Sequence, residues 1–335
     1  MSTASEPPVI EVRDLVKVYP GGTRAVDGID FSVAPGELFG FLGPNGAGKT
    51  TTIRILATLL HQTAGVARVA GFDVASQPAE VRRRLGLAMQ TPALDAFSTG
   101  RETLELAGRL HRMPADDIRR RADELLELMG LASVARKLTG TYSGGMKRRL
   151  DLASALMHRP AVLILDEPTE GLDPQSRAAL WEELERISAT GTTMLLTTHY
   201  MEEADRLCSR LAIIDNGTIV VEGEPAELKR SVGADTVLLQ LDASDGDLEA
   251  QRAAVRRLLD GLVAPEGIFD DPAGVSLAVP NASTAIPALL RRLDRDGVRI
   301  GGLQMSQPSL DSVFMKYTGR HIRAEAADQP IILGW

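Results

Sequence analysis

The sequence lacks the features that mark secreted, membrane-spanning or nucleic-acid-binding proteins. Of its 335 residues a single one is cysteine, Cys208, so no disulfide can form within the chain, as is usual for a reducing cytoplasm. No apolar run approaches the roughly 20 residues that cross a bilayer. Residues 1–8 lack the basic and apolar regions of a signal peptide. We therefore expect a soluble chain with no transmembrane segment, which would reach a membrane only through another subunit.

The sequence also lacks an excess of basic residues. The chain carries 37 lysines and arginines against 45 acidic residues, a net charge of −8. Surfaces that bind nucleic acid are usually basic, so we expect no nucleic-acid partner. Internal repeats, low-complexity segments and long heptad runs are absent from the sequence. With 44% hydrophobic residues the chain can bury ample cores, and its length predicts one large or two modest domains.

The strongest motif present lies at residues 43–50, Gly43-Pro44-Asn45-Gly46-Ala47-Gly48-Lys49-Thr50, with the spacing G-x-x-x-x-G-K-[ST] of a P-loop. An apolar strand is predicted before it, at residues 38–42, and a helix after it. Glycines let backbone amides converge on phosphate oxygens. Lys49 would reach the β- and γ-phosphates, and the Thr50 hydroxyl would ligate Mg²⁺. The motif predicts a bound nucleoside triphosphate.

A second candidate group lies further along the chain. Residues 161–165 are apolar without alternation, which predicts a strand buried on both faces of a parallel sheet. Asp166 and Glu167 follow it, at the end where α/β sheets bind ligands. Asp166 suits a Mg²⁺ carboxylate, and Glu167 suits a base that polarises the attacking water. His199 ends a neighbouring buried strand, residues 192–198. We interpret it as a γ-phosphate sensor, although a lone histidine is more often structural.

Three signals are weaker than these motifs. Tyr19 precedes a glycine turn and is interpreted as a platform for an adenine ring, although it could simply pack on a sheet. Gln90 ends a predicted strand at residues 85–89. Ser143-Gly144-Gly145 has the form of an anion site at a helix start, although such a string is often only a flexible turn.

The composition predicts two domains with short tails. We assign residues 1–8 to a tail, 9–229 to a nucleotide-binding domain with a helical insertion at about 93–157, 230–320 to an accessory domain, and 321–335 to a second tail. Short strands before the P-loop predict an antiparallel sheet beside the nucleotide site. In the accessory domain we expect strands at 236–241, 275–279 and 298–305 and helices at 247–262, 285–294 and 309–317. That order suggests a small α+β domain of the ferredoxin-like split βαβ kind.

Residues 9–223 as a whole resemble the ATP-binding cassette of ABC transporters. The motifs occur in cassette order: the aromatic A-loop at Tyr19, Walker A at 43–50, the Q-loop at Gln90, the signature at 143–145, Walker B at 163–166 with Glu167, the D-loop at 171–173, and the H-loop at His199. The resemblance implies an α/β P-loop NTPase fold, namely a RecA-like core with an antiparallel β-subdomain and a helical subdomain, followed by the small C-terminal α+β domain.

The resemblance also implies a complete site for ATP and Mg²⁺. It gives catalytic roles to Glu167, His199 and Lys49, and Mg²⁺ contacts to Thr50, Gln90 and Asp166. It gives ATP contacts to Tyr19, Gly43, Pro44, Asn45, Gly46, Ala47, Gly48, Lys49, Thr50, Thr51, Gln90, Ser143, Gly144, Gly145 and Asp173. Two cassettes would face head to tail as a homodimer, with Ser143 and Gly145 of one copy binding the γ-phosphate held by the other.

Two departures and the C-terminal end narrow the resemblance. Met146 stands where many cassettes have glutamine, and Glu170 stands where a small polar residue is frequent. Residues 308–314 with 318–320 resemble daunorubicin-resistance-type cassettes of ABC-2 exporters. This implies an ATPase that drives efflux of drugs, lipids or other hydrophobic compounds through a separate ABC-2-type permease, from the cytoplasmic face of the cell membrane. A ribosome- or DNA-associated ABC ATPase and an importer cassette are the alternatives. The sequence does not name the substrate.

Overall fold

A computed structural model describes residues 7–233, 235–241, 248–259, 263, 268–271, 274–279, 281–295, 298 and 300–319. The chain divides into two compact units, with the break between residues 225 and 226 and the return between 316 and 317. The first unit contains β1 (Ile10–Val18), β2 (Arg24–Val33), β3 (Leu38–Leu42), α1 (Lys49–Leu56), β4 (Ala64–Val69), β5 (Phe72–Asp73), α2 (Pro78–Arg84), β6 (Leu85–Ala88), α3 (Gly100–Leu110), α4 (Ala115–Leu128), α5 (Gly144–Leu156), β7 (Val162–Asp166), α6 (Pro174–Ala189), β8 (Thr193–Thr198), α7 (Met201–Leu207), β9 (Arg210–Asp215) and β10 (Thr218–Gly223).

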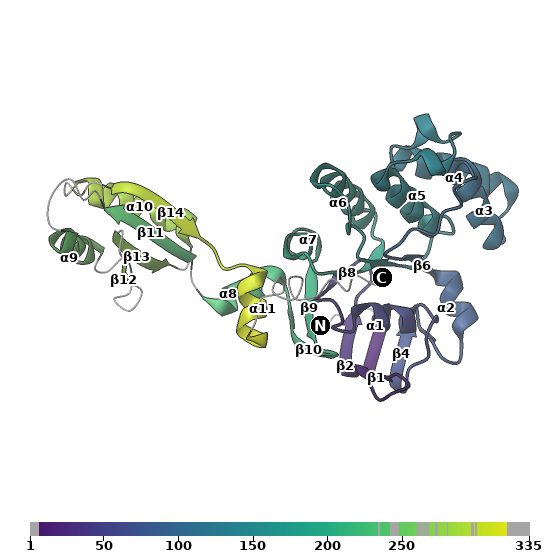
Figure 1. The fold of residues 1–335 in the computed structure, drawn as a ribbon, viewed down its shortest axis with the longest axis horizontal. Coiled ribbons are helices and arrows are strands. Elements are labelled where there is room, and N and C mark those ends of the chain that lie inside the picture. The colour runs from purple at the N-terminus through teal and green to yellow at the C-terminus, as the bar shows by residue number, and fades with distance from the viewer. Residues whose placement is uncertain are drawn as a thin grey trace, which may run out of the picture. The chain divides into compact units, whose positions relative to one another are not determined.

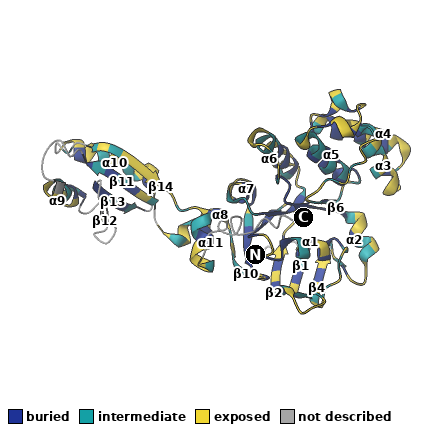
Figure 2. Ribbon diagram, viewed as in Figure 1, coloured by how far each residue is buried: buried dark blue, intermediate teal, exposed yellow. Residues whose placement is uncertain are grey.

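A six-stranded sheet forms the centre of this unit, in the order β10-β9-β3-β8-β7-β6. Its strands are parallel except the edge strand β10, which returns antiparallel from β9 as a hairpin. Every residue of β3, β7 and β8 is buried (Figure 2). The buried parallel strands predicted from the unbroken apolar runs are therefore confirmed. Because β3, β7 and β8 are parallel neighbours, the loops that follow them meet at one edge of the sheet.

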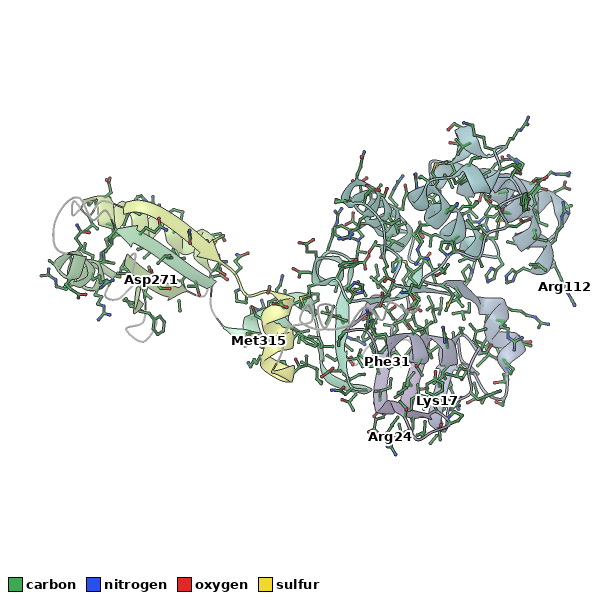
Figure 3. The ribbon with its side chains drawn as sticks, in the orientation of Figure 1. Lys17, Arg24, Phe31, Arg112, Asp271 and Met315 are labelled. Atoms are coloured by element: carbon green, nitrogen blue, oxygen red, sulfur yellow. The ribbon has the colours of Figure 1, made fainter. Side chains whose placement is uncertain are left out.

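A second sheet has the order β2-β1-β4-β5, and its strands are antiparallel as predicted. Phe31 of β2, which Figure 3 labels, lies against Phe39 and Phe41 of β3, with ring centroids 5.7 and 4.8 Å apart. The two sheets therefore share a core. Strand β1 is continuous, with an irregular register around Asp14. Strand β4 ends at Val69, because positive φ angles at Ala70 and Gly71 turn the chain.

The predicted helical insertion is a lobe of α3, α4 and α5 (Figure 1). Thr99 and Glu102 form a capping box at the start of α3. The buried residues of α4 recur at helical spacing on one face, namely Ile118, Ala122, Leu125 and Leu126. Among the described residues, no helix combines the length and hydropathy needed to cross a bilayer.

The second unit contains α8 (Pro225–Val232, from residue 226), β11 (Asp235–Leu241), α9 (Leu248–Leu259), β12 (Ile268–Asp271), β13 (Gly274–Val279), α10 (Ala282–Arg295), β14 (Ile300–Ser306) and most of α11 (Leu310–Thr318). Its antiparallel sheet has the order β12-β13-β11-β14. The chain order β11-α9-β12-β13-α10-β14 in that sheet is the ferredoxin-like arrangement that the sequence suggested.

Two elements of this unit were not predicted. Strand β12 has four residues, with Phe269 exposed. Its sequence is too short to show the alternation of apolar and polar residues from which a strand is predicted. Helix α8 extends across residue 229, the predicted end of the nucleotide-binding domain. The helix predicted at 247–262 is described over Leu248–Leu259, and the predicted tail at 321–335 lies outside the described residues.

Candidate functional site

The P-loop connects β3 to α1 at the carboxyl edge of the central sheet. Gly48 has a φ of 105°, and a Cβ there would lie 2.4 Å from the Ala25 carbonyl oxygen, so only glycine fits. Gly46 also has a positive φ, with open space beside it. The loop borders a depression of about 260 Å³. Its lining consists of Pro44, Asn45, Gly46, Gly48, Lys49, Thr50, Thr51, Gln90 and Glu167.

Lys49 is 3% exposed and begins α1. Its ammonium donates to the carbonyl oxygens of Gly43 at 2.7 Å and Pro44 at 3.0 Å, and it pairs with the Glu167 carboxylate at 3.2 Å. Burial lowers the pKa of Lys49, and the carboxylates of Glu167 and Asp166 oppose that shift. The loop carbonyls therefore aim the ammonium into the depression, where it can meet phosphate oxygens.

Glu167 follows β7 and is 6% exposed, with a φ of 46° that non-glycine residues rarely adopt. One carboxylate oxygen pairs with Lys49, and the other lies 3.1 Å from His199 Nδ1. Burial raises the pKa of Glu167, but the hydrogen bond from His199 and the charge of Lys49 outweigh it and lower the pKa to about 2. The side chain is thus an ionised carboxylate with His199 beside it, as a base that orients water requires.

Asp166 is fully buried beside the P-loop helix. Its Oδ1 accepts hydrogen bonds from Thr197 Oγ1 at 2.6 Å and Thr50 Oγ1 at 3.2 Å, while its buried Oδ2 has no hydrogen-bond partner among the described residues. Mg²⁺ prefers oxygen ligands of this kind, so the orphaned carboxylate oxygen and the Thr50 hydroxyl fit the cation. Thr197 was not predicted. The signal for it is a polar residue in a buried strand, paired in register with Asp166.

Gln90 lines the same depression, and its amide donates to the Glu170 carboxylate. Glu170, which departs from the usual cassette sequence, therefore has a hydrogen-bond partner that lines the site. Asp173, predicted to contact ATP, caps helix α6 in the structure. Its carboxylate accepts from the backbone of Gln175 at 3.1 Å and of Ser176 at 3.0 Å.

Tyr19 lies just beyond β1, and its hydroxyl is 3.4 Å from Thr51 Oγ1. Lys17 Nζ lies 5.4 Å from the centroid of its ring. The tyrosine is half-buried and is not among the residues that line the depression at Lys49. It nevertheless touches the first turn of the P-loop helix, which is compatible with a ring platform beside the loop.

The signature residues lie elsewhere. Ser143 caps α5 by accepting from the Met146 amide at 3.3 Å, as the helix-start interpretation predicted. Gly145 faces α6, since a Cβ there would lie 3.0 Å from Ser176 Oγ. Residues 143–145 do not contribute to the described lining of the depression at Lys49. One chain alone thus leaves its signature away from its own P-loop.

Two buried charged residues were not predicted from the sequence. Arg148 shares an inward face of α5 with Leu152 and Ala155 and contacts the backbone around Glu167. Glu203 of α7 is fully buried and accepts from Trp181 Nε1 at 3.0 Å. Burial raises the pKa of Glu203. Helical periodicity, which places both on apolar faces, is the signal that could have found them.

Comparison with known proteins agrees with this geometry. Residues 26–170 match the ABC transporter family, and residues 223–318 match the C-terminal domain of DrrA1-3-like ATP-binding proteins. The daunorubicin resistance ATP-binding protein DrrA2 of Streptomyces coeruleorubidus is 46% identical over 89% of this chain and 92% of its own length. The Nod factor export ATP-binding protein I of Ralstonia nicotianae is 40% identical over 94% of this chain and 95% of its own length.

A solved ATP-binding subunit of an ABC transporter superposes on the chain with a TM-score of 0.61 and 31% identity. The match covers 67% of this chain and 92% of that subunit. The predicted cassette fold is thereby confirmed.

Proposed function

We propose, from the premise that this chain belongs to the ABC transporter family of ATP-binding subunits, that its P-loop site binds and hydrolyses Mg²⁺–ATP to drive export through a separate membrane subunit. ATPase activity is general for such cassettes. The observation that carries the assignment of residues is the ionised Glu167 carboxylate, held between Lys49 and His199 beside the P-loop.

The phosphates would be held by the backbone amides of residues 43–50 and by the Lys49 ammonium. The Thr50 hydroxyl and Asp166 would hold Mg²⁺, with Gln90 beside them. When bound, Mg²⁺ neutralises charge that develops on the phosphate oxygens. Glu167 would accept a hydrogen bond from the attacking water and orient it, while His199 fixes the carboxylate from its other side.

The signature would act in a second copy of the chain. Ser143 caps α5, so the N-terminus of this helix, which favours anions, lies at residues 143–145. The distance of these residues from the depression of their own chain supports a head-to-tail homodimer, in which Ser143 and Gly145 of one copy meet the γ-phosphate held by the other. Asp173 and Tyr19 would contribute near the dimer contact and the adenine ring.

The membrane subunit would be an ABC-2-type permease, and the chain would work at the cytoplasmic face of the membrane. A second depression of about 390 Å³ is the permease contact that we propose. It lies between the end of α1, strand β6 and helix α5, and Leu59 on its rim is 60% exposed. Because β6 leads directly to Gln90, a permease helix seated there would touch the segment that enters the ATP site.

The exported cargo that we propose is a drug, lipid or other hydrophobic compound. Relatives named for daunorubicin resistance and for Nod factor export support a role in export of such compounds. The cargo would contact the permease rather than this chain, so its identity follows from the partner.

A pull-down from native membranes tests the proposal. The Glu167→Gln variant with ATP and Mg²⁺ should retain a polytopic permease, and the Glu167→Gln, Lys49→Ala double variant serves as the matched control. Capture of one membrane protein that depends on Lys49 and ATP supports the exporter assignment. Capture of ribosomal or DNA-bound proteins with no membrane protein would replace it with a non-transport ABC ATPase, and capture of a permease that imports a solute would reverse the direction.

A further inference from the structure

One buried arginine binds three backbone carbonyl groups in two segments of the ATP site. Arg148 of helix α5 is 4% exposed. Its Nε donates to the Pro168 carbonyl oxygen at 2.7 Å, and its Nη2 donates to the Asp166 carbonyl oxygen at 3.0 Å. Its Nη1 donates to the carbonyl oxygen of Met89. Each of the three guanidinium nitrogens therefore donates to a different backbone carbonyl oxygen of the site.

The positions of the three carbonyls give the contacts their significance. Asp166 and Pro168 stand on either side of Glu167, whose backbone φ of 46° is unfavourable for any residue other than glycine. Met89 precedes Gln90, which lines the depression at Lys49. The guanidinium therefore clamps the turn that carries Glu167 and the start of the segment that carries Gln90.

A lysine could not reproduce this arrangement. The planar guanidinium presents donors in fixed and divergent directions, whereas one ammonium is a compact point charge on a flexible stem. Asp151, one turn along α5, lies 3.6 Å from Arg148 Nη1 and is the nearest charge partner that the structure records for it. The same aspartate lines the depression between α1, β6 and α5. Asp151 thus lies beside the nitrogen that donates to the Met89 carbonyl oxygen, where its charge can orient the guanidinium.

We propose that Arg148, oriented by Asp151, is a positioning residue for ATP hydrolysis that holds the Glu167 turn and the start of the Gln90 segment in register with helix α5. The inference rests on the proposed function, because it takes Glu167 as the base. Arg148 contacts none of the P-loop residues in the hydrogen bonds described for it, so it should influence turnover rather than ATP affinity.

The test compares Arg148→Lys with Arg121→Lys in the purified full-length protein. Arg121 is a largely buried arginine of the helical lobe that donates to the Leu156 carbonyl oxygen and pairs with Glu124, away from the Glu167 turn. We expect Arg148→Lys to lower kcat by about 10-fold or more, because small displacements of a reacting group are costly, while the Kd for ATP stays within about threefold. Arg121→Lys should change kcat by less than about twofold.

A second variant guards against a folding defect in the first. Asp151→Asn keeps the side-chain volume and should lower kcat less than Arg148→Lys, again with ATP binding retained. When Asp151→Asn is added to Arg148→Lys, it should lower kcat by a smaller factor than it does alone, because the two residues act as one unit. A merely structural role would lower ATP binding and turnover together, and additive effects would likewise contradict the proposal.

The outcomes separate this inference from the function on which it rests. If the unmodified protein hydrolyses ATP, Glu167→Gln abolishes that turnover, and Arg148→Lys retains full kcat, the positioning role is refuted and the ATPase assignment stands. If Glu167→Gln hydrolyses ATP as fast as the unmodified protein, the assignment of the base fails, and the role given to Arg148 fails with it.

Discussion

The Lys49 ammonium lies 3.2 Å from one oxygen of the Glu167 carboxylate, and His199 Nδ1 lies 3.1 Å from the other. The P-loop, the strand that carries the acidic pair and the strand that precedes the histidine are thereby joined through one carboxylate. A γ-phosphate at the P-loop would share the Lys49 ammonium with Glu167. This arrangement leads to separate expectations for the lysine and for the glutamate.

Replacing the lysine should remove ATP binding. In Lys49→Ala the P-loop loses the one cation that its carbonyls aim into the depression, and Glu167 loses its partner charge. We expect the affinity for Mg²⁺–ATP to fall by about 100-fold, as for a charged group that contacts a phosphate directly. Equilibrium binding of a fluorescent ATP analogue measures this. An affinity within a few-fold of that of the unmodified protein would show that Lys49 does not contact the phosphates.

Replacing the glutamate should separate binding from turnover. Glu167→Gln keeps the shape of the side chain and removes the negative charge that would orient water. We expect kcat to fall by about 100-fold or more, which is the usual contribution of a general base, with ATP still bound. Single-turnover hydrolysis and binding of the analogue measure the two effects. Turnover at the rate of the unmodified protein would show that another group is the base.

Much of this site could be predicted from the sequence, because its parts are encoded locally. An unbroken apolar run ending in Asp166 and Glu167 predicts both a buried strand and the edge at which the carboxylates emerge. The glycines of residues 43–50 predict the loop, since Gly48 has no room for a Cβ. Each of these inferences depends on a few neighbouring residues, so a single sequence suffices.

The parts that could not be predicted depend on long-range contacts or on very short elements. Thr197 bonds to Asp166 only because β7 and β8 pair in register, and the approach of Arg148 to Pro168 depends on how α5 packs on the sheet. Strand β12 is recognisable only through its pairing with β13. Glu170 departs from the usual cassette sequence, and its partner Gln90 lies 80 positions away.

The signature gives an expectation that concerns two copies of the chain. Ser143→Arg places a long cation at the start of α5, where the partner's γ-phosphate would lie in a head-to-tail dimer. We expect hydrolysis to be lost while each monomer still binds ATP, because residues 143–145 do not line the described depression of their own chain. Activity rescued by mixing this variant with Lys49→Ala would support composite sites, since one of the two sites in such a dimer is intact. Normal turnover in Ser143→Arg alone would argue against the cross-dimer contact.

His158 gives an expectation about stability and pH. Its ring stacks on that of His111, with centroids 3.6 Å apart and an interplanar angle of 3°. Its Nε2 lies 3.1 Å from the Leu85 carbonyl oxygen, and in the part of the chain that the structure describes its buried Nδ1 has no hydrogen-bond partner. Burial, with a further contribution from the charge of His111, lowers the pKa of His158 from 6.5 to about 4. If His158 gained a second proton, its Nδ1 would carry a hydrogen with no acceptor among the described residues, and the resulting charge would lie against the His111 ring.

The sign of the effect follows from where the proton binds. Between pH 6.5 and about pH 4 the unfolded chain holds a proton at His158 that the folded chain does not. Folding stability from this group is therefore complete above pH 6.5 and is lost as the pH falls toward 4. One pKa unit corresponds to about 1.4 kcal/mol, so a fall from 6.5 to about 4 corresponds to roughly 3.5 kcal/mol. Because the ring is partly exposed and solvent screens its charge, the loss on full acidification is on the order of 2 kcal/mol.

His158→Gln tests this, because the glutamine amide can still donate to the Leu85 carbonyl oxygen and does not titrate. We expect the free energy of unfolding of the unmodified protein to fall more steeply between pH 7.5 and pH 4.5 than that of the variant, as measured by urea unfolding at each pH. His61→Gln, at an exposed histidine in the loop after α1, is the matched control and should follow the unmodified protein. If His158→Gln lost stability as steeply as the unmodified protein, the stacked pair would not be the group that titrates, and its folded pKa would have to lie near the ordinary value.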